Sequence, residues 1–259
     1  MINLSIIIPT FNEDGRIKKT LKTLKQGVYF YGQNLKEIIF SDDGSTDETL
    51  RLIKKAKKSI ERKTKAKVKI ISYEKNKGRG YAIRQAALCA KGDYILYADA
   101  DFSIPLENIK KFIPYMKKDY DVIIGSKKIE GSKEIIKRSL IRKIVGYCHS
   151  FVTYLVLGVF VWDFQGGFKI FSRRYVDRIF PHLKIDRWGF DMETIFLAKK
   201  LNYRLKELPV RWAHFEENSK VMLFRDIFRS IEEMIKIKYH WLEGKYQKDV
   251  IPKFAINYS

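Results

Sequence analysis

The first half of the chain alternates short apolar runs with longer stretches that have helical spacing. The apolar runs occupy residues 4–9, 37–41, 68–72, 94–98 and 121–125. Strands that are apolar almost throughout, and that are separated by helices, are typical of a parallel sheet covered on both faces. A chain of 259 residues is long enough to bury one large core of this kind. The sequence therefore predicts an α/β fold with a mostly parallel, Rossmann-like sheet flanked by helices.

The segment after the second run predicts where a helix begins. Ser45 and Glu48 have the spacing of a capping box, so we expect a helix to start at this point. The basic stretch that follows, residues 54–69, is predicted to be helical, because Ile53, just before it, and Ala56 and Ile60 within it have helical spacing. We interpret it as the solvated face of a helix rather than as a stripe that binds nucleic acid.

Polar clusters follow three of the predicted strands, at residues 9–13, 42–47 and 99–103. The carboxyl ends of parallel strands meet at one edge of a sheet, which is where ligands collect in such folds. We therefore expect the three clusters to line a common edge and to form the functional site.

Two carboxylates, Asp99 and Asp101, stand one residue apart at the end of the fourth strand. Carboxylates placed this close repel each other, and hard divalent cations such as Mg²⁺ or Mn²⁺ prefer oxygen ligands. The pair predicts a cation site that also holds the phosphates of a substrate. By itself such a pair is a weak signal, because acidic residues are common in turns.

The neighbouring clusters offer a pocket for a nucleotide. An aromatic or proline edge beside a carboxylate suits a base, and glycines beside a guanidinium ahead of a helix suit a diphosphate. The residues that we assign to nucleotide binding, together with Asp99, are Pro9, Phe11, Glu13, Asp42, Asp43, Gly78 and Arg79.

The second half of the chain has longer helical patterns and ends in an amphipathic stretch. Its apolar face consists of Phe224, Ile227, Phe228, Ile231, Met234 and Ile235. This face either packs on the core or lies in the lipid interface, as Tyr239 and Trp241 would favour. We predict a domain at 1–218 and an amphipathic extension at 219–259, and the apolar run at 151–162 is too short to span a membrane.

The formal net charge of +21 calls for an anionic partner, which could be nucleic acid, a membrane surface or a phosphorylated substrate. The lysines are spread through nearly every predicted helix, and this spread disfavours a nucleic-acid recognition surface. Cys89 and Cys148 lack the spacing of a disulfide framework or a zinc site, which suggests a reducing compartment.

Four motifs in the first half together resemble the family 2 glycosyltransferases of the GT-A fold. They are "SIIIPTFNE" at 5–13, "SDDGSTD" at 41–47, "NKGRGYAIRQA" at 76–86 and "DADFSIP" at 99–105. In the second half, "WDFQGGFKIFSR" at 162–173 and "DRWGFDMET" at 186–194 are similar to segments of the dolichyl-phosphate glucosyltransferase branch. The resemblance covers residues 3 to 246.

This resemblance implies that a sugar, glucose from UDP-glucose, is moved onto a polyprenyl phosphate such as dolichyl phosphate with inversion. It implies Mg²⁺ or Mn²⁺ on Asp99 and Asp101, with Asp101, Asp163 and Asp191 as the catalytic carboxylates. A structural role such as helix capping is the alternative for Asp163 or Asp191. The residues expected to hold the acceptor phosphate or the sugar are Lys127, Arg138, Arg142, Gln165 and Lys169.

Two alternative activities remain open: a GDP-mannose-dependent polyprenyl-phosphate mannose synthase, and a family 2 transferase with a soluble glycan acceptor. A lipid phosphate does not leave the bilayer cheaply, and lysines are attracted to the anionic cytoplasmic leaflet. We therefore expect a peripheral, monotopic enzyme at the cytoplasmic face of the membrane, with a nucleotide sugar, a polyprenyl phosphate and an anionic membrane surface as partners.

Overall fold

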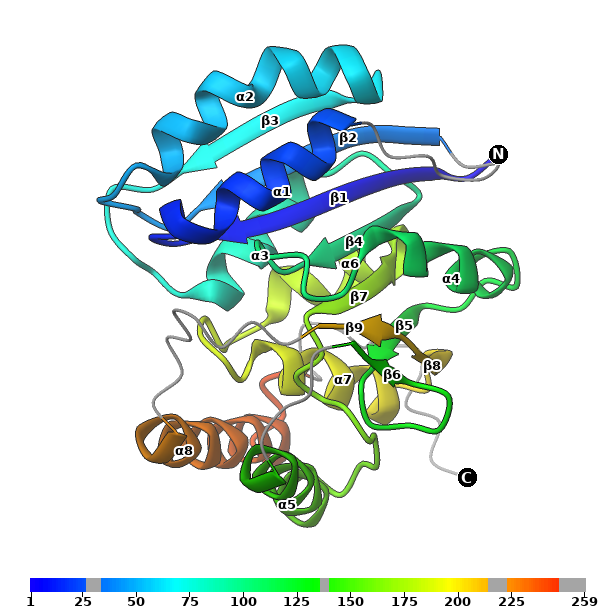
Figure 1. Cartoon of the computed structure of the whole chain (residues 1–259). Coiled ribbons are helices and arrows are strands. Elements are labelled where there is room, and N and C mark those ends of the chain that lie inside the picture. The colour runs from blue at the N-terminus through cyan, green and yellow to red at the C-terminus, as the bar shows by residue number, and fades with distance from the viewer. Residues whose placement is uncertain (27–33, 136–139, 214–222, 247–259) are drawn as a thin grey trace.

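The computed structural model describes residues 1–26, 34–135, 140–213 and 223–246 (Figure 1). For residues 140–142 and 223–227 the backbone alone is described. The predicted boundary between 218 and 219 and the predicted acceptor residue Arg138 lie outside the described residues.

A seven-stranded sheet in the order β3-β2-β1-β4-β7-β5-β8 forms the centre of the molecule. Its strands are β1 (Asn3–Thr10), β2 (Asn34–Asp42), β3 (Lys67–Ser72), β4 (Tyr94–Ala98), β5 (Val122–Ser126), β7 (Phe168–Ser172) and β8 (Leu205–Pro209). All five predicted strands are present, and the sheet is mostly parallel as expected. The exception is β7, which lies antiparallel between β4 and β5. A separate parallel pair joins β6 (Lys133–Glu134) to β9 (Arg211–Trp212).

Helices cover both faces of the sheet. One face carries α1 (Asp14–Gln26), α2 (Thr49–Thr64) and α4 (Ile109–Met116), and the other carries α3 (Arg79–Cys89), α6 (Arg173–Ile179) and α7 (Phe190–Lys200). Two short 3-10 turns, η1 (Leu106–Asn108) and η2 (Phe180–His182), lie next to α4 and α6. Two longer helices, α5 (Leu140–Leu157) and α8 (Leu223–Leu242), lie at the lower end of the molecule in Figure 1.

Side-chain alternation along the strands explains why there are two cores. In β1, Ile6 and Ile8 join the core beneath α1, α2 and α4, whereas Ile7 joins the core beneath α3, α6 and α7. Successive side chains of a strand point to opposite faces, so an apolar strand feeds both cores at once. This is the pattern predicted from the near-continuous apolar runs.

The predicted helix start at Ser45 is wrong, because α2 begins at Thr49. The Ser45 hydroxyl donates to Oδ1 of Asp42 at 2.5 Å, and its backbone N–H donates to Oδ2 of the same residue at 3.1 Å. The carboxylate of Asp42 is fully buried and needs donors, so Ser45 closes a turn instead of capping a helix. Asp47 accepts from the backbone N–H of Thr49 at 2.9 Å.

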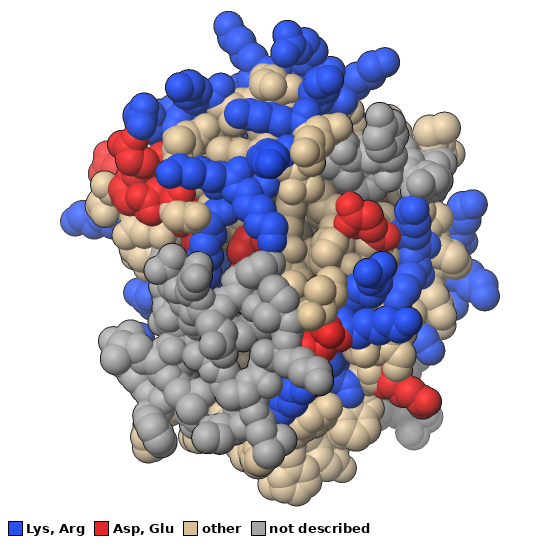
Figure 2. Space-filling model, in the orientation of Figure 1, with Lys and Arg blue, Asp and Glu red and all other residues tan. Residues whose placement is uncertain are grey.

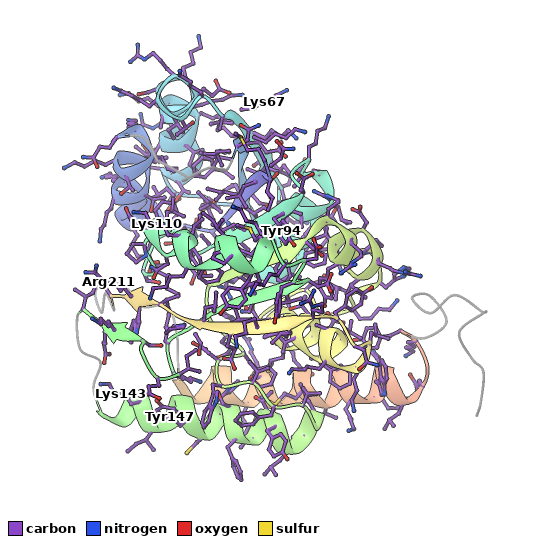
Figure 3. All side chains as sticks on the ribbon, turned by 90° about the vertical axis from the view of Figure 1, so that its right-hand side faces the viewer. Lys67, Tyr94, Lys110, Lys143, Tyr147 and Arg211 are labelled. Carbon is purple, nitrogen blue, oxygen red and sulfur yellow. The ribbon has the colours of Figure 1, made fainter. Side chains whose placement is uncertain are left out.

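The α5 and α8 helices lie side by side in both Figure 1 and Figure 3. A hydrogen bond of 2.7 Å between Nε2 of His149 and Oγ of Ser230 joins them. Burial lowers the pKa of His149 to about 4, so this imidazole is neutral near pH 7. Met234 and Ile237 of α8 are buried in the core, which places one face of this helix on the protein.

The opposite faces of α5 and α8, together with the segment that follows α5, expose large apolar side chains, which we call the apolar platform. Its members are Ile144, Tyr147, Phe151, Tyr154, Leu155, Phe160, Trp162, Phe228, Ile235, Tyr239 and Leu242. In Figure 3, Tyr147 lies on α5 at the lower edge of the molecule, with Lys143 at the start of the same helix. The predicted apolar face of α8 is thus divided, since Met234 packs inward while Phe228 and Ile235 are exposed.

Within the described residues, no helix combines the length and the apolar character needed to span a bilayer. Figure 2 shows Lys and Arg side chains over the top of the molecule, around α1 and α2, whereas the lower edge near α5 is largely uncharged.

Candidate active site

The acidic pair lies where β4 ends, at the edge predicted from the sequence. Asp99 follows Ala98, and its backbone N–H donates to the carbonyl of Gly167 at 3.1 Å. The Tyr97 hydroxyl donates to Oδ1 of Asp99 at 3.0 Å, and the Ser103 N–H donates to Oδ1 of Asp101 at 2.8 Å. Both carboxylates remain partly exposed. They are therefore held in place and still accessible to a ligand.

Gly167, just before β7, is required by the position of Asp99. A Cβ atom at residue 167 would lie 1.7 Å from Oδ2 of Asp99, so any other residue there would displace this carboxylate. The antiparallel β7 strand thus brings a glycine directly against the first carboxylate of the pair. No pattern in the sequence indicated this contact.

Arg79 links the acidic pair to the second half of the chain. Its guanidinium forms an ion pair with Oδ1 of Asp99 and a second one, at 3.1 Å, with Oδ2 of Asp191. The guanidinium also lies near two aromatic rings. Its Cζ atom is 5.1 Å from the ring centroid of Tyr97 and 5.0 Å from that of Trp188. Burial disfavours the charge of Arg79, but the two carboxylates raise its pKa above the ordinary value. Arg79 is therefore a charged group shared between two carboxylates.

The Gly-rich loop brings Arg79 to this position through close backbone contacts. Gly78 has φ +116, and a Cβ atom there would lie 2.3 Å from the carbonyl of Asp186. Glycine is the residue that reaches this backbone conformation without strain. The start of α3 can therefore pack against the turn that leads to Asp191.

Lys169 lies behind Asp191 rather than at the surface of the site. Its side chain is fully buried, and Nζ donates to Oδ1 of Asp191 and to the carbonyl of Gly166, each at 2.6 Å. Our prediction that Lys169 contacts the sugar or the diphosphate does not fit this position, because Asp191 and Gly166 already engage a buried ammonium group. The geometry instead gives Lys169 the task of orienting Asp191.

The carboxylate of Asp191 is not the cap of α7. Both of its oxygens face cations, whereas the N–H of Gly189 at the helix start donates to Oε2 of Glu233, from α8, at 2.6 Å. Burial raises the pKa of Glu233. The capping alternative that the sequence left open therefore does not apply to Asp191, which lies in the site together with Arg79 and Asp99.

Asp42 and Asp43 anchor the loops of the expected nucleotide pocket. Asp42 accepts from the hydroxyl of Thr10 at 3.1 Å, and Asp43 accepts from the N–H groups of Lys77 and Gly78 at 2.8 and 2.9 Å. Burial raises the pKa of Asp43, although the two N–H donors act in the opposite direction. In this structure Asp43 fixes the Gly-rich loop that carries Arg79.

The loop after β1 lies against the loop after β2. Asn12 accepts from the N–H of Thr46 at 2.8 Å, and its own N–H donates to Ser45 at 2.9 Å. Pro9 is buried in β1, Phe11 is exposed, and Glu13 pairs with Arg16 at 2.7 Å. The three polar clusters thus meet at one edge of the sheet, as predicted.

On the expected acceptor side, Asp163 accepts from the backbone N–H of Lys127 at 2.9 Å. Asp163 is itself fixed by Glu207, which accepts from its N–H at 3.0 Å. The ammonium group of Lys127 lies 5.3 Å from the ring centroid of Trp212. Asp163 is buried, and in this structure it positions the loop that carries Lys127.

Sequence reasoning missed Lys128, whose Nζ donates to the carbonyl of Gly146 and to the hydroxyl of Ser150, at 2.7 and 2.6 Å. This residue joins the end of β5 to α5 and so connects the site to the apolar platform. Its position next to Lys127 in the sequence is the signal that could have identified it. Gln165 is exposed in the loop before β7, and the side chain of Arg142 is outside the described part of α5.

Oxygen ligands suitable for a hard divalent cation are present at the acidic pair, and Asp99 already binds a cationic group, the guanidinium of Arg79. Among the described residues, no three His, Cys, Asp or Glu side chains form a cluster that could hold a metal ion. Asp99 and Asp101 therefore fit a cation that takes its remaining ligands from substrate phosphates and water.

A cavity of about 560 Å³ lies beside the small β6–β9 pair. Its walls are Lys111, Lys133, Ile135 and Arg211, and Figure 3 shows Arg211 at the edge of the molecule, above Lys143. Lys111 donates to the carbonyl of Pro209 at 2.9 Å. None of the four lining residues belongs to the predicted site.

Comparisons with known proteins agree with the geometry. Residues 5–180 match the family model described as glycosyl transferase family 2. The chain is 33% identical over 257 residues to dolichyl-phosphate beta-glucosyltransferase of Dictyostelium discoideum, covering 94% of this chain and 76% of that protein. It is 32% identical over 262 residues to the enzyme of the same name from Saccharomyces cerevisiae, covering 95% and 77%.

A solved structure has the same fold. Glucosyl-3-phosphoglycerate synthase from Mycobacterium tuberculosis, in complex with Mn²⁺, uridine diphosphate and phosphoglyceric acid, superimposes with a TM-score of 0.64 at 14% identity. The match covers 92% of this chain and 78% of that one. The fold is therefore of the GT-A type, as expected from the motifs. With the family model covering both carboxylates of the acidic pair and most of the sheet, this chain belongs to glycosyl transferase family 2.

Proposed function

We propose that the protein transfers glucose from UDP-glucose to a polyprenyl phosphate, such as dolichyl phosphate, at the cytoplasmic face of a membrane. The observation that carries this proposal is the similarity to dolichyl-phosphate beta-glucosyltransferases, which extends over 94% of the chain and so includes the acceptor side. The uridine diphosphate and Mn²⁺ of the M. tuberculosis structure support a nucleotide donor and a divalent cation.

In the proposed reaction, an oxygen of the acceptor phosphate attacks the anomeric carbon of the sugar. The bond from that carbon to the diphosphate oxygen breaks, and the nucleoside diphosphate leaves with the bonding electrons, which inverts the configuration. Asp99 and Asp101 would hold a divalent cation, which would neutralise the charge that develops on the leaving group.

The protein's main contribution is positioning, because a phosphate acceptor is already anionic near neutral pH. Lys127 is the described cation that we assign to the acceptor phosphate, with Arg142 of α5 as a further candidate. Asp163 fixes the Lys127 loop. Asp191 orients the acceptor or a sugar hydroxyl through Arg79, because both of its own oxygens are paired, and Lys169 holds the carboxylate of Asp191 in place.

The membrane assignment rests on the apolar platform. Its side chains lie on two adjacent helices and on the segment that follows α5, and Lys143, Lys236 and Lys238 lie on the same helices. Monomeric soluble proteins rarely expose large contiguous apolar surfaces. Lys128 ties this surface to the end of β5, so a lipid phosphate held at Lys127 would have its chain near the platform. The enzyme would lie on the bilayer as a peripheral, monotopic protein.

The test is incubation of the purified protein with a panel of labelled nucleotide sugars, vesicles containing a polyprenyl phosphate, and Mn²⁺, followed by extraction with organic solvent. We expect label from UDP-glucose in the organic phase. The Asp99→Asn and Asp101→Asn variants should abolish this transfer, whereas Asp177→Asn, at an exposed position of α6, should not change it.

The other outcomes discriminate between the alternatives. Label from GDP-mannose in the organic phase would identify a polyprenyl-phosphate mannose synthase. Label that stays in the aqueous phase on an added glycan would identify a soluble acceptor. Transfer that is unaffected by replacing both Asp99 and Asp101 would contradict the proposed site.

A further inference from the structure

Arg79 occupies the same carboxylate that the proposed divalent cation needs. Its guanidinium pairs with Oδ1 of Asp99, the oxygen that also accepts the Tyr97 hydroxyl. The other oxygen, Oδ2, lies against Gly167, where a Cβ atom would come within 1.7 Å. Because one side of Asp99 is closed by backbone, a cation and Arg79 must share the remaining approach to the carboxylate.

Arg79 also has a second carboxylate to hold. Its Nη1 lies 3.1 Å from Oδ2 of Asp191, while Oδ1 of Asp191 is fixed by the buried Lys169 at 2.6 Å. Asp191 is 1% exposed, so it stays in place whatever happens at Asp99. Arg79 can therefore leave Asp99 without becoming an unpaired charge.

From these contacts we propose that Arg79 is a positioning residue that competes with the divalent cation for Asp99 and so couples the cation site to Asp191. When the cation binds Asp99, Arg79 retains Asp191 and turns its freed N–H groups toward the phosphates that arrive with the cation. Forked contacts to carboxylates and phosphates are what a guanidinium provides and an ammonium group does not. This inference rests on the proposed cation site but not on the identity of the sugar or the acceptor.

The experiment measures the affinity of the protein for Mn²⁺ alone, from the EPR signal of free Mn²⁺, with no nucleotide present. Removing the competing charge in Arg79→Met should tighten Mn²⁺ binding by about tenfold, since even screened unit charges at contact distance interact strongly enough for such a change. Arg79→Lys keeps one charge but cannot span both carboxylates, so its affinity should lie between those of Arg79→Met and the wild type.

A matched control is available on the same helix. Arg84 is also part-buried and paired, with Asp186 at 2.7 Å, but it contacts neither Asp99 nor Asp191 in the described contacts. Arg84→Met should leave Mn²⁺ affinity unchanged. Circular dichroism of each variant establishes that it is folded, and Arg79→Lys serves as the test if Arg79→Met does not fold.

A double-mutant cycle tests the coupling to Asp191. Asp191→Asn frees Arg79 to pair fully with Asp99, so Mn²⁺ binding should weaken by about threefold or more, and this effect should shrink in the Arg79→Met background. An Arg79→Met variant, or failing that Arg79→Lys, that binds Mn²⁺ no tighter than the wild type would overturn the proposal, as would an Asp191→Asn effect of equal size in both backgrounds. If Asp99→Asn and Asp101→Asn leave Mn²⁺ affinity unchanged, the cation site itself is wrong.

Discussion

The ammonium group of Lys169 lies 2.6 Å from Oδ1 of Asp191, and both side chains are buried. The two residues come from β7 and α7, so this ion pair fastens an interior strand of the sheet to the helix that carries a candidate catalytic carboxylate. Removing Asp191 would leave the buried ammonium group of Lys169 uncompensated, and removing Lys169 would leave the buried carboxylate of Asp191 paired with Arg79 alone.

Replacing Lys169 with Met should therefore lower the free energy of unfolding by about 3 kcal/mol and also reduce kcat, because Asp191 would lose its fixed orientation. Urea unfolding and steady-state kinetics measure the two effects. The control is Lys199→Met. Lys199 is an exposed lysine on α7, the helix that carries Asp191, and its replacement should change the free energy of unfolding by no more than about 0.5 kcal/mol. A Lys169→Met protein as stable as the wild type would contradict a buried, charged pair.

Gly167→Ala should impair the acidic pair without touching either carboxylate chemically. The new Cβ atom would overlap Oδ2 of Asp99, so this side chain must move. Misplacement of a catalytic group by about 1 Å costs roughly hundredfold in rate, and we expect kcat/KM and Mn²⁺ affinity to fall together. Gly146→Ala in α5 is the control, since its nearest neighbour is the Lys128 side chain at 3.8 Å. Unchanged Mn²⁺ affinity in Gly167→Ala would argue against Asp99 as a ligand.

The apolar platform predicts binding to lipid. Phe151, Leu155 and Phe228 are 60%, 62% and 73% exposed. Burying these three apolar side chains in the lipid interface would favour binding to the membrane. The triple change to Glu should weaken co-sedimentation with anionic vesicles by at least about tenfold, while the protein remains folded. Leu88→Glu alters an exposed leucine in α3 and should have no effect. Equal sedimentation of all these proteins would exclude the platform as the membrane contact.

The raised pKa of Glu193 predicts how the free energy of unfolding depends on pH. Burial raises its pKa to about 7 from 4.5, although the Tyr246 hydroxyl and the N–H groups of Lys184 and Ile185 favour the charged form. The folded chain thus keeps a proton that the unfolded chain releases, so the stabilisation is complete below about pH 4.5 and is lost as the pH rises through about 7.

The loss expected from Glu193 is about 3 kcal/mol across this interval, from about 1.4 kcal/mol for each unit of pKa difference. Urea unfolding between pH 5 and pH 8 should show a clearly smaller decline in Glu193→Gln than in the wild type. Glu232→Gln, at an exposed position of α8, should retain the wild-type slope. A Glu193→Gln protein with the wild-type slope would show that another group controls this region.

Much of the site was predictable because its signals are local. The five strand runs, the loops that follow them and the acidic pair each occupy a few consecutive residues, and the loops meet at one edge because parallel strands end there. The helix start at Ser45 was not predictable in this way, since a buried carboxylate three residues earlier competes for the same hydroxyl. The role of Lys169 was missed for a different reason, because its partner Asp191 is 22 residues away.

By itself, the sequence determined the layered α/β arrangement, the edge where the loops gather and the position of Asp99 and Asp101 at the end of a strand. Periodicity and turn chemistry act over a few residues, which is why they can be read directly. Only the tertiary structure decided that β7 runs antiparallel against Asp99, and that Arg79 joins Asp99 to Asp191, a residue 112 positions further along the chain. These contacts depend on packing between distant segments, and no local pattern specifies which buried charges will become neighbours.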